Sequence, residues 1–265
     1  MKIIEKNLWE NTPGMCEEVP TLTAYIPDEK KSDAAVVILP GGGYEMRAAH
    51  EGEGYAKFLA EHGYTAFVCA YRVSPHRFPL PLLDARRAMR TVRHNAAEYG
   101  LDKNKILIMG SSAGGHLAAL TSTYFEKIDY EGTDEIDGED FIPNGQILCY
   151  PVIMLSGDEA HLGSAVNLLG EKNGEMSDKL SPNLLVTEKT PKAFIWSTFA
   201  DNCVPVSNSI DYASALHKGG TGVELHVYPD GNHGLGLADG GECKANDHVS
   251  NWSCELLKWL EYNNF

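Results

Sequence analysis

KILIMGSSAGGHL, residues 105–117, joins an apolar run to a helical segment through a corner of small residues. The branched apolar residues before the corner favour a buried strand, and the alanines and leucines after it favour a helix. Gly110, Ala113 and Gly114 let the two backbones pass closely. In this G-x-S-x-G pattern the central residue, Ser112, lies at the tip of a strained turn with its hydroxyl exposed. A plain turn or a phosphate-binding loop has similar residues, so the remaining sequence has to distinguish these uses.

Apolar, β-branched runs recur along the chain and alternate with stretches whose apolar residues have helical spacing. Several runs are almost continuously apolar, as in parallel strands that are buried on both faces. The 265 residues therefore predict a single α/β domain over 1–265, with a mostly parallel central sheet and helices on both faces. We expect strands at 21–27, 34–40, 65–73, 105–110, 145–153, 192–200 and 223–229, and helices at 51–62, 79–99, 114–126, 205–218 and 246–262.

Two segments interrupt this alternation. Residues 127–144 are rich in acidic side chains and are interpreted as a solvated surface loop. Residues 154–191 contain a short helical piece around SAVNLLG. This second insertion lies between late strands, where it forms either a small cap over a site or a structural flap.

The bulk composition excludes several classes of partner. A formal net charge of −15 opposes binding to nucleic acid or to an anionic membrane surface. The N-terminal residues lack the apolar core of a signal peptide, and no apolar stretch is 18 residues long. We therefore expect a cytoplasmic protein without a membrane partner, and the sequence leaves open whether it forms a homo-oligomer.

The cysteines are scattered and form neither a C-x-x-C motif nor a metal-like pairing with histidine. Those inside apolar runs are interpreted as small buried hydrophobic residues with reduced thiols. No metal and no cofactor is expected from this pattern. The six positions are Cys16, Cys69, Cys149, Cys203, Cys243 and Cys254.

A serine nucleophile needs a base and an orienting carboxylate. Among ten histidines, His233 in YPDGNHGLG follows the last predicted strand, where this chain order places the base. KAFIWSTFADNCVPV places Asp201 at the end of an intermediate strand, which gives the order Ser112, Asp201, His233. Asp230, only three residues before His233, is the rival acid and is expected instead to cap the turn. His94 and His116 are interpreted as surface or packing residues.

Three consecutive glycines follow the strand in ILPGGGYEMR, residues 38–47. They form either a bare loop or a source of backbone N–H groups for a developing oxyanion. We expect Gly42 and Gly43 to donate together with the N–H of Ala113, the residue after the nucleophile; the sequence leaves open which glycine of residues 41–43 is the donor. Ser111 is expected to point away and to form a local hydrogen bond.

For several other polar side chains near these motifs, the sequence leaves two roles open. The residues after the glycines either reach a polar substrate or begin a surface helix; they are Tyr44, Arg47, His50 and Glu51. Trp196 and Phe199 precede the acid on a predicted buried strand, so both are interpreted as core residues.

Seven motifs together resemble the acetyl-xylan-esterase-like α/β hydrolases, small bacterial carbohydrate esterases related to the hormone-sensitive-lipase and prolyl-oligopeptidase groups. The similarity extends from about residue 20 to the C-terminus, through PGGGY (40–44), AYRV (70–73), PLPLLDARRAMRTVR (79–93), GSSAGGHLA (110–118), SPNLLV (181–186), ADNCVPV (200–206) and GNHGLGLA (231–238). The resemblance implies an α/β-hydrolase fold with a small or reduced cap. One departure is Pro40, where lipase-like relatives carry histidine before the glycines.

The resemblance implies that Ser112, Asp201 and His233 act as nucleophile, acid and base. It also implies removal of acetyl groups from xylan or xylo-oligosaccharides, with a small-molecule or oligosaccharide ester as the partner. Two alternatives of the same fold are a general short-chain carboxylesterase and a small serine peptidase. A third, from another class, is a non-catalytic binding protein.

Overall fold

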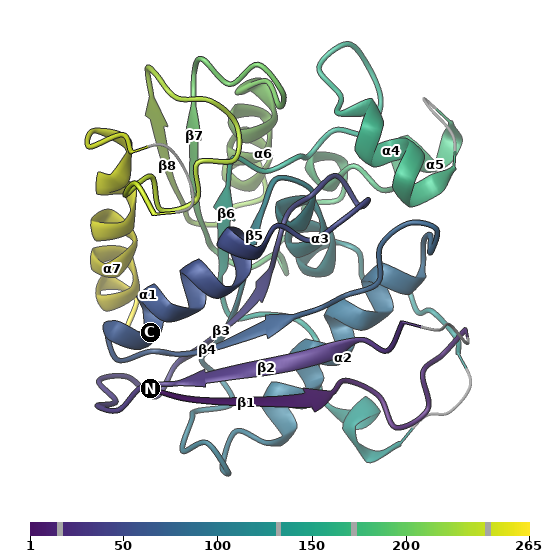
Figure 1. Cartoon of the computed structure of the whole chain (residues 1–265). Coiled ribbons are helices and arrows are strands. Elements are labelled where there is room, and N and C mark those ends of the chain that lie inside the picture. Colours follow the sequence, from purple (N-terminus) through teal and green to yellow (C-terminus); the bar gives the residue numbers. More distant parts are fainter. Residues whose placement is uncertain (15–17, 131–133, 171–173, 242–244) are drawn as a thin grey trace.

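One eight-stranded sheet, in the order β1-β2-β4-β3-β5-β6-β7-β8, organises the chain (Figure 1). The structure is a computed structural model, and it describes residues 1–14, 18–130, 134–170, 174–241 and 245–265. From β4 to β8 every neighbouring pair is parallel. The strands are β1 (Lys2–Asn7), β2 (Thr21–Ile26), β3 (Ala35–Leu39), β4 (Thr65–Cys69), β5 (Ile106–Ser111), β6 (Gln146–Cys149), β7 (Ala193–Thr198) and β8 (Val223–Tyr228).

Helices cover both faces of this sheet, as the continuous apolar runs predict. Alternate residues of β3 point to opposite sides: Val37 lies in the core beneath α2, α3 and α6, whereas Val36 lies in the core beneath α1 and α7. Figure 1 shows α1 and α7 together on the left of the sheet, and α2 and α3 on the right. The helices that cover the sheet are α1 (Tyr55–Glu61), α2 (Leu80–His94), α3 (Ser112–Thr123), α6 (Ser207–Lys218) and α7 (Trp252–Tyr262).

The N-terminal strand β1 was not predicted. It pairs antiparallel with β2, and β2 pairs antiparallel with β4, so this edge departs from the parallel pattern. Five of its six residues are exposed. An exposed edge strand carries no buried apolar run, which is why the sequence pattern does not indicate it.

The insertion at 154–191 contains α4 (Leu162–Leu169) and α5 (Glu175–Lys179), which lie beside each other apart from the sheet (Figure 1). The side-chain amide of Asn167, on α4, donates to the carbonyl of Gly43 at 2.8 Å. This hydrogen bond ties the insertion to the glycine loop that follows β3.

The acidic segment 127–144 is not simply solvated, contrary to expectation. The carboxylate of Asp134 lies 2.6 Å from the guanidinium of Arg87 on α2, and that of Asp137 lies 3.2 Å from it. The Arg87 side chain is almost fully buried, so it requires counter-charges. The acidic residues supply them.

Cysteine burial follows the apolar runs. Cys69 and Cys149 are buried, as predicted, whereas Cys203 and Cys254 are exposed. Cys16 and Cys243 lie outside the described residues. Within the described ranges, no helix combines the length and hydropathy that a bilayer crossing requires.

Candidate active site

The turn between β5 and α3 places Ser112 at its tip. β5 ends at Ser111 and α3 begins at Ser112, whose φ of 51° lies in the left-handed region. A Cβ atom at Gly110 would clash with the carbonyl of Gly114, and one at Gly114 would clash with the carbonyl of Leu39. The helix can therefore cross the strand ends this closely only with glycine at both positions.

Ser111 points away from the turn tip, but its hydrogen bond is not local. Its hydroxyl donates to the phenol oxygen of Tyr55 at 3.0 Å, 56 residues away in the sequence. The expectation of a local partner is wrong because Ser111 still belongs to β5, and its buried side chain faces the side of the sheet that α1 covers.

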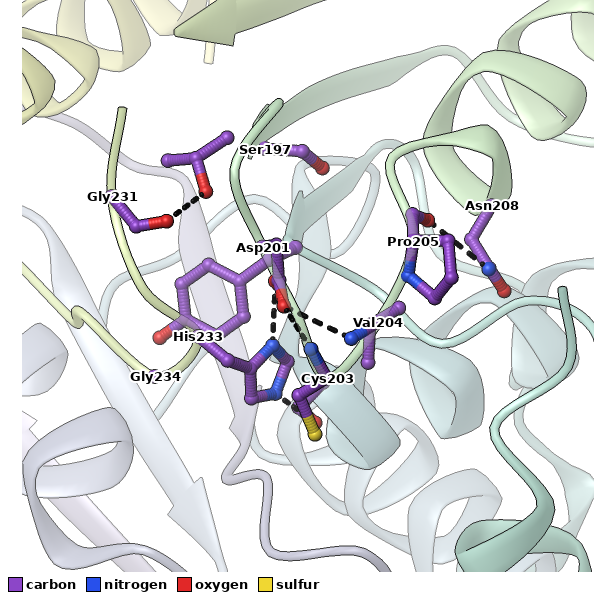
Figure 2. A network of polar contacts seen from close by, with 12 residues as sticks. Ser197, Asp201, Cys203, Val204, Pro205, Asn208, Gly231, His233 and Gly234 are labelled. Atoms are coloured by element: carbon purple, nitrogen blue, oxygen red, sulfur yellow. Dashed lines mark hydrogen bonds and ion pairs between the residues drawn. The ribbon is translucent and has the colours of Figure 1, made fainter. Parts of the chain in front are cut away.

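His233 links Ser112 to Asp201. Its Nε2 atom lies 2.8 Å from Oγ of Ser112. Its Nδ1 atom lies 2.7 Å from Oδ2 of Asp201, the contact that Figure 2 shows. A carboxylate only accepts hydrogen bonds, so Nδ1 carries the proton and Nε2 accepts from the serine hydroxyl. The structure thus brings the three predicted residues together in the geometry of a nucleophile, a base and an orienting acid.

The carboxylate of Asp201 has its hydrogen-bonding sites filled by the turn that follows β7. Its Oδ1 atom accepts the backbone N–H groups of Cys203 and Val204, each at 2.9 Å (Figure 2). The hydroxyl of Thr198 donates to the carbonyl of Gly231 at 2.7 Å and joins this turn to the loop that carries His233. Asp201 therefore holds the imidazole from a fixed position.

Asp230 does not compete for this role. It is exposed, and within the described residues its carboxylate makes no hydrogen bond; only its backbone carbonyl accepts one, from Asn246 at 3.4 Å. The expected side-chain cap of the turn is absent there.

The glycine loop after β3 packs against the nucleophile turn. A Cβ atom at Gly41 would lie 3.0 Å from the Cβ atom of Ser112. The N–H of Gly41 donates to Oε2 of Glu51 at 2.8 Å, whereas the N–H groups of Gly42 and Gly43, the predicted donors, form no backbone hydrogen bond among the residues that the structure describes. Ala113 occupies the first turn of α3, where backbone N–H groups lack helical acceptors.

Of the four polar residues after this loop, His50 and Glu51 open the short helix His50–Gly54, so the expected helix start is confirmed for these two, although Glu51 is buried rather than on the surface. Tyr44 and Glu51 are buried, and Arg47 donates to the carbonyl of Tyr71 at 2.7 Å. His50 donates from Nε2 to the carbonyl of Gly234 at 3.0 Å, next to His233. All four side chains also form hydrogen bonds that hold other protein segments in place.

Trp196 and Phe199 have different environments. Trp196 is fully buried and stacks on Trp252 with 4.9 Å between ring centroids, which confirms the predicted core role. Phe199 is 70% exposed, so the same prediction is wrong for it. β7 ends at Thr198, and Phe199 already belongs to the turn beyond the sheet.

Two further histidines lie close to the site. Burial lowers the pKa of His116 to about 4, and its ring bridges the Tyr44 hydroxyl (2.7 Å) and the Leu180 carbonyl (2.8 Å), consistent with the packing role expected of it. His161 caps the N-terminus of α4, and its Nε2 atom lies 3.6 Å from Sγ of Cys203. Burial, and then the charge of His233, lower the pKa of His161.

Sequence reasoning missed Tyr150. This residue follows β6 directly, and its ring lies edge-on to the ring of His233, with 5.1 Å between centroids. Its place at the carboxyl end of a predicted parallel strand was the available signal, because such ends line the ligand side of an open sheet.

The chain is similar to a known protein family and to several known proteins. The BD-FAE family model matches residues 22–216. Over 264 residues, 96% of the chain, the sequence is 34% identical to an endo-1,4-beta-xylanase B of Butyrivibrio fibrisolvens. Over 223 residues, 82% of the chain, it is 35% identical to an acetylxylan esterase of Xylanibacter ruminicola. These matches cover 40% and 44% of the two relatives, so the chain spans about two fifths of their length.

Among solved structures, an acetyl ester-xyloside bifunctional hydrolase from Caldicellulosiruptor lactoaceticus is 41% identical to this chain, with a TM-score of 0.91. The match covers 99% of this chain and 97% of that one. The predicted α/β-hydrolase fold and the resemblance to acetyl-xylan-esterase-like enzymes are confirmed by these similarities.

Proposed function

This chain belongs to the BD-FAE family, and on that premise we propose that it is a serine carboxylic-ester hydrolase. Its proposed reaction removes O-acetyl groups from xylan or xylo-oligosaccharides through an acyl-enzyme. The observation that carries the proposal is the hydrogen-bonded series Ser112–His233–Asp201, with 2.8 Å and 2.7 Å between the paired atoms.

In the first half of the reaction, Oγ of Ser112 attacks the acetyl carbonyl while Nε2 of His233 takes the serine proton. The carboxylate of Asp201 stabilises the imidazolium that forms. The carbonyl oxygen becomes an oxyanion, for which we assign the N–H groups of Gly42, Gly43 and Ala113 as donors. The intermediate then expels the sugar hydroxyl, which leaves with the proton from His233.

In the second half, water attacks the acetyl-serine. His233 now takes a proton from the water and returns it to Oγ of Ser112 as acetate departs. In balance, one water is consumed, the ester C–O bond is replaced by a C–O bond to the oxygen of that water, and one sugar hydroxyl and one acetic acid are released. Nothing in this sequence of steps needs a cofactor.

The substrate class rests on two kinds of support. The similar proteins carry the words acetylxylan esterase, xylanase and acetyl ester-xyloside hydrolase in their names. The net charge of −15 also suits a neutral carbohydrate ester better than a polyanion.

The test compares p-nitrophenyl esters of increasing acyl length with acetylated xylo-oligosaccharides. We expect acetyl esters to react much faster than octanoyl esters, and acetate to be released from the oligosaccharide at a comparable kcat/KM. Turnover of the aryl esters without oligosaccharide deacetylation would instead indicate a general short-chain carboxylesterase. Cleavage of peptide substrates alone would indicate a peptidase, and failure of a serine-directed phosphonate to label Ser112 would overturn the esterase proposal.

A further inference from the structure

Behind the candidate active site, a chain of buried hydroxyl groups ends on the carboxylate of Glu51. Ser111 donates to Tyr55 at 3.0 Å, and the hydroxyls of Tyr55 and Tyr150 lie 3.2 Å apart. Tyr150 donates to Oε1 of Glu51 at 2.7 Å. The only proton of the Tyr150 hydroxyl is used on Glu51, so Tyr55 is the donor to Tyr150.

The second oxygen of Glu51 holds the glycine loop. Its Oε2 atom accepts the N–H of Gly41 at 2.8 Å, and the Glu51 side chain is only 3% exposed. A carboxylate buried to this degree is tolerated when hydrogen-bond donors satisfy it. Gly41 immediately precedes Gly42 and Gly43, so the position of Glu51 sets where their N–H groups lie.

Tyr150 holds the loop that carries His233, on the other side of the site from the glycine loop. Its hydroxyl accepts the N–H of Gly236 at 2.9 Å, and its ring lies edge-on to that of His233. The φ of Tyr150 is 36°, a left-handed conformation that a bulky residue adopts only when its surroundings enforce it. The Tyr150 side chain therefore connects Glu51 to the segment that carries the base.

We propose that Glu51 is a positioning residue for ester hydrolysis. One carboxylate fixes the oxyanion loop through Gly41 and, through Tyr150, the loop that carries His233. This inference rests on the proposed function and adds a residue to it. Glu51 acts through these partners and does not touch the substrate.

The chemistry of the two donors makes glutamine a sharp test. Gly41 N–H and the Tyr150 hydroxyl both donate, and a carboxylate accepts on both oxygens. A glutamine of the same shape turns its NH₂ group toward one of these donors. Toward Gly41 the hydrogen bond is lost, and toward Tyr150 it persists only if the hydroxyl reverses and stops accepting from Tyr55 or Gly236. His50 also faces the group, with Nε2 3.7 Å from Oε1, but its proton is directed to the Gly234 carbonyl.

The experiment measures kcat and KM on p-nitrophenyl acetate, the rate of phosphonate labelling of Ser112, and the thermal midpoint. Its variants are Glu51→Gln and Tyr150→Phe. We expect kcat and the labelling rate to fall by about tenfold to hundredfold, with KM within about twofold, because misplaced donors and base affect the transition state more than substrate binding. The double variant should lose less than the product of the single losses, since both changes break one connection.

Glu53→Gln is the matched control. Glu53 lies two residues away, is half exposed and pairs with Lys57 at 2.8 Å, so the same loss of charge should leave kcat unchanged. A residue that only stabilises the fold would lower the thermal midpoint without a selective fall in kcat in the folded protein.

Three outcomes would overturn the inference: a kcat for Glu51→Gln within twofold of the unchanged protein, a rise in KM alone, or fully multiplicative losses in the double variant. If Glu51→Gln does not fold, Tyr150→Phe, which removes only one hydroxyl, tests the proposal with the same measurements. Failure of the proposed function gives a different result, because the unchanged protein would then neither hydrolyse the ester nor be labelled at Ser112.

Discussion

Asp201 and His233 project from the ends of two neighbouring parallel strands, β7 and β8, and their Oδ2 and Nδ1 atoms lie 2.7 Å apart. They are 32 residues apart in the sequence. Asp230 is only three residues from His233, yet it is exposed. Proximity at the carboxyl edge of the sheet, rather than in the chain, selects the acid.

Asp201→Asn should therefore lower kcat by about 10²–10⁴-fold, because an amide in this place favours the wrong tautomer of the imidazole. The same substitution in the chymotrypsin triad lowers kcat by about 10⁴-fold. Steady-state kinetics measures the loss, and slow phosphonate labelling of Ser112 should persist.

Asp230→Asn serves as the control for this substitution. Its carboxylate makes no hydrogen bond within the described residues, so kcat and the thermal midpoint should hardly change. A large loss of turnover in folded Asp230→Asn, with Asp201→Asn nearly silent, would show that the acid is misassigned.

The two adjacent serines should differ sharply. Ser112→Ala removes the group that faces Nε2 of His233, so turnover and phosphonate labelling should both disappear. Ser111→Ala removes only the first donor of the buried hydroxyl chain. It should retain most activity and lose about 1 kcal/mol of unfolding free energy, as measured by urea denaturation. Labelling that survives in Ser112→Ala would contradict the assignment.

His116 should make stability depend on pH. Its folded pKa of about 4 lies below the usual value of 6.5, so the unfolded chain binds more protons between these values. Stability is therefore fully present above pH 6.5 and decreases as the pH falls toward 4, by about 2 kcal/mol at pH 5.

Urea unfolding at pH 7 and pH 5 measures this contribution. In His116→Gln the amide can still accept from Tyr44 and donate to Leu180, but it does not titrate. This variant should lose less stability on acidification than the wild-type protein. Equal pH dependence of His116→Gln and the unchanged protein would refute the prediction.

The left-handed backbone of Ser112 should reduce the stability of the fold. A left-handed conformation costs a non-glycine residue about 1–2 kcal/mol of stability, and glycine avoids this cost. Glycine also makes the unfolded chain more flexible, which lowers the stability of the folded protein by about 0.5–1 kcal/mol. Both Ser112→Gly and Ser112→Ala lack the nucleophile, so their difference reports the backbone. In urea titrations, Ser112→Gly should be more stable than Ser112→Ala by about 0.5–1 kcal/mol. A glycine variant that is less stable than the alanine variant would show that the turn is unstrained.

Much of the fold is predictable because burial leaves a local pattern. Strands β2 to β8 coincide with apolar runs, and Ser112, Asp201 and His233 each follow such a run. The partners of Glu51 are not predictable in this way, since Tyr150 lies 99 residues from it. Pairing at that separation depends on the order of strands in the sheet, which a periodic pattern does not encode.

The same reasoning explains the surface residues that were misjudged. Phe199 has the composition of a strand residue but lies one position beyond the end of β7. The sequence around Asp134 predicts a solvated carboxylate, whereas the structure shows that it forms an ion pair with Arg87. Strand ends and ion-pair partners depend on contacts between distant segments.

The hydrogen bond from Asn167 to the Gly43 carbonyl limits how freely the insertion at 154–191 can be exchanged. Residues 154–191 look like an exchangeable unit, since they leave the sheet and return to it. Their helix α4 is nevertheless fastened to the loop whose N–H groups we assign to the oxyanion. A chimera that takes this segment from another esterase must also bring an amide donor at the place of Asn167, or it will alter the turnover rate along with the choice of ester.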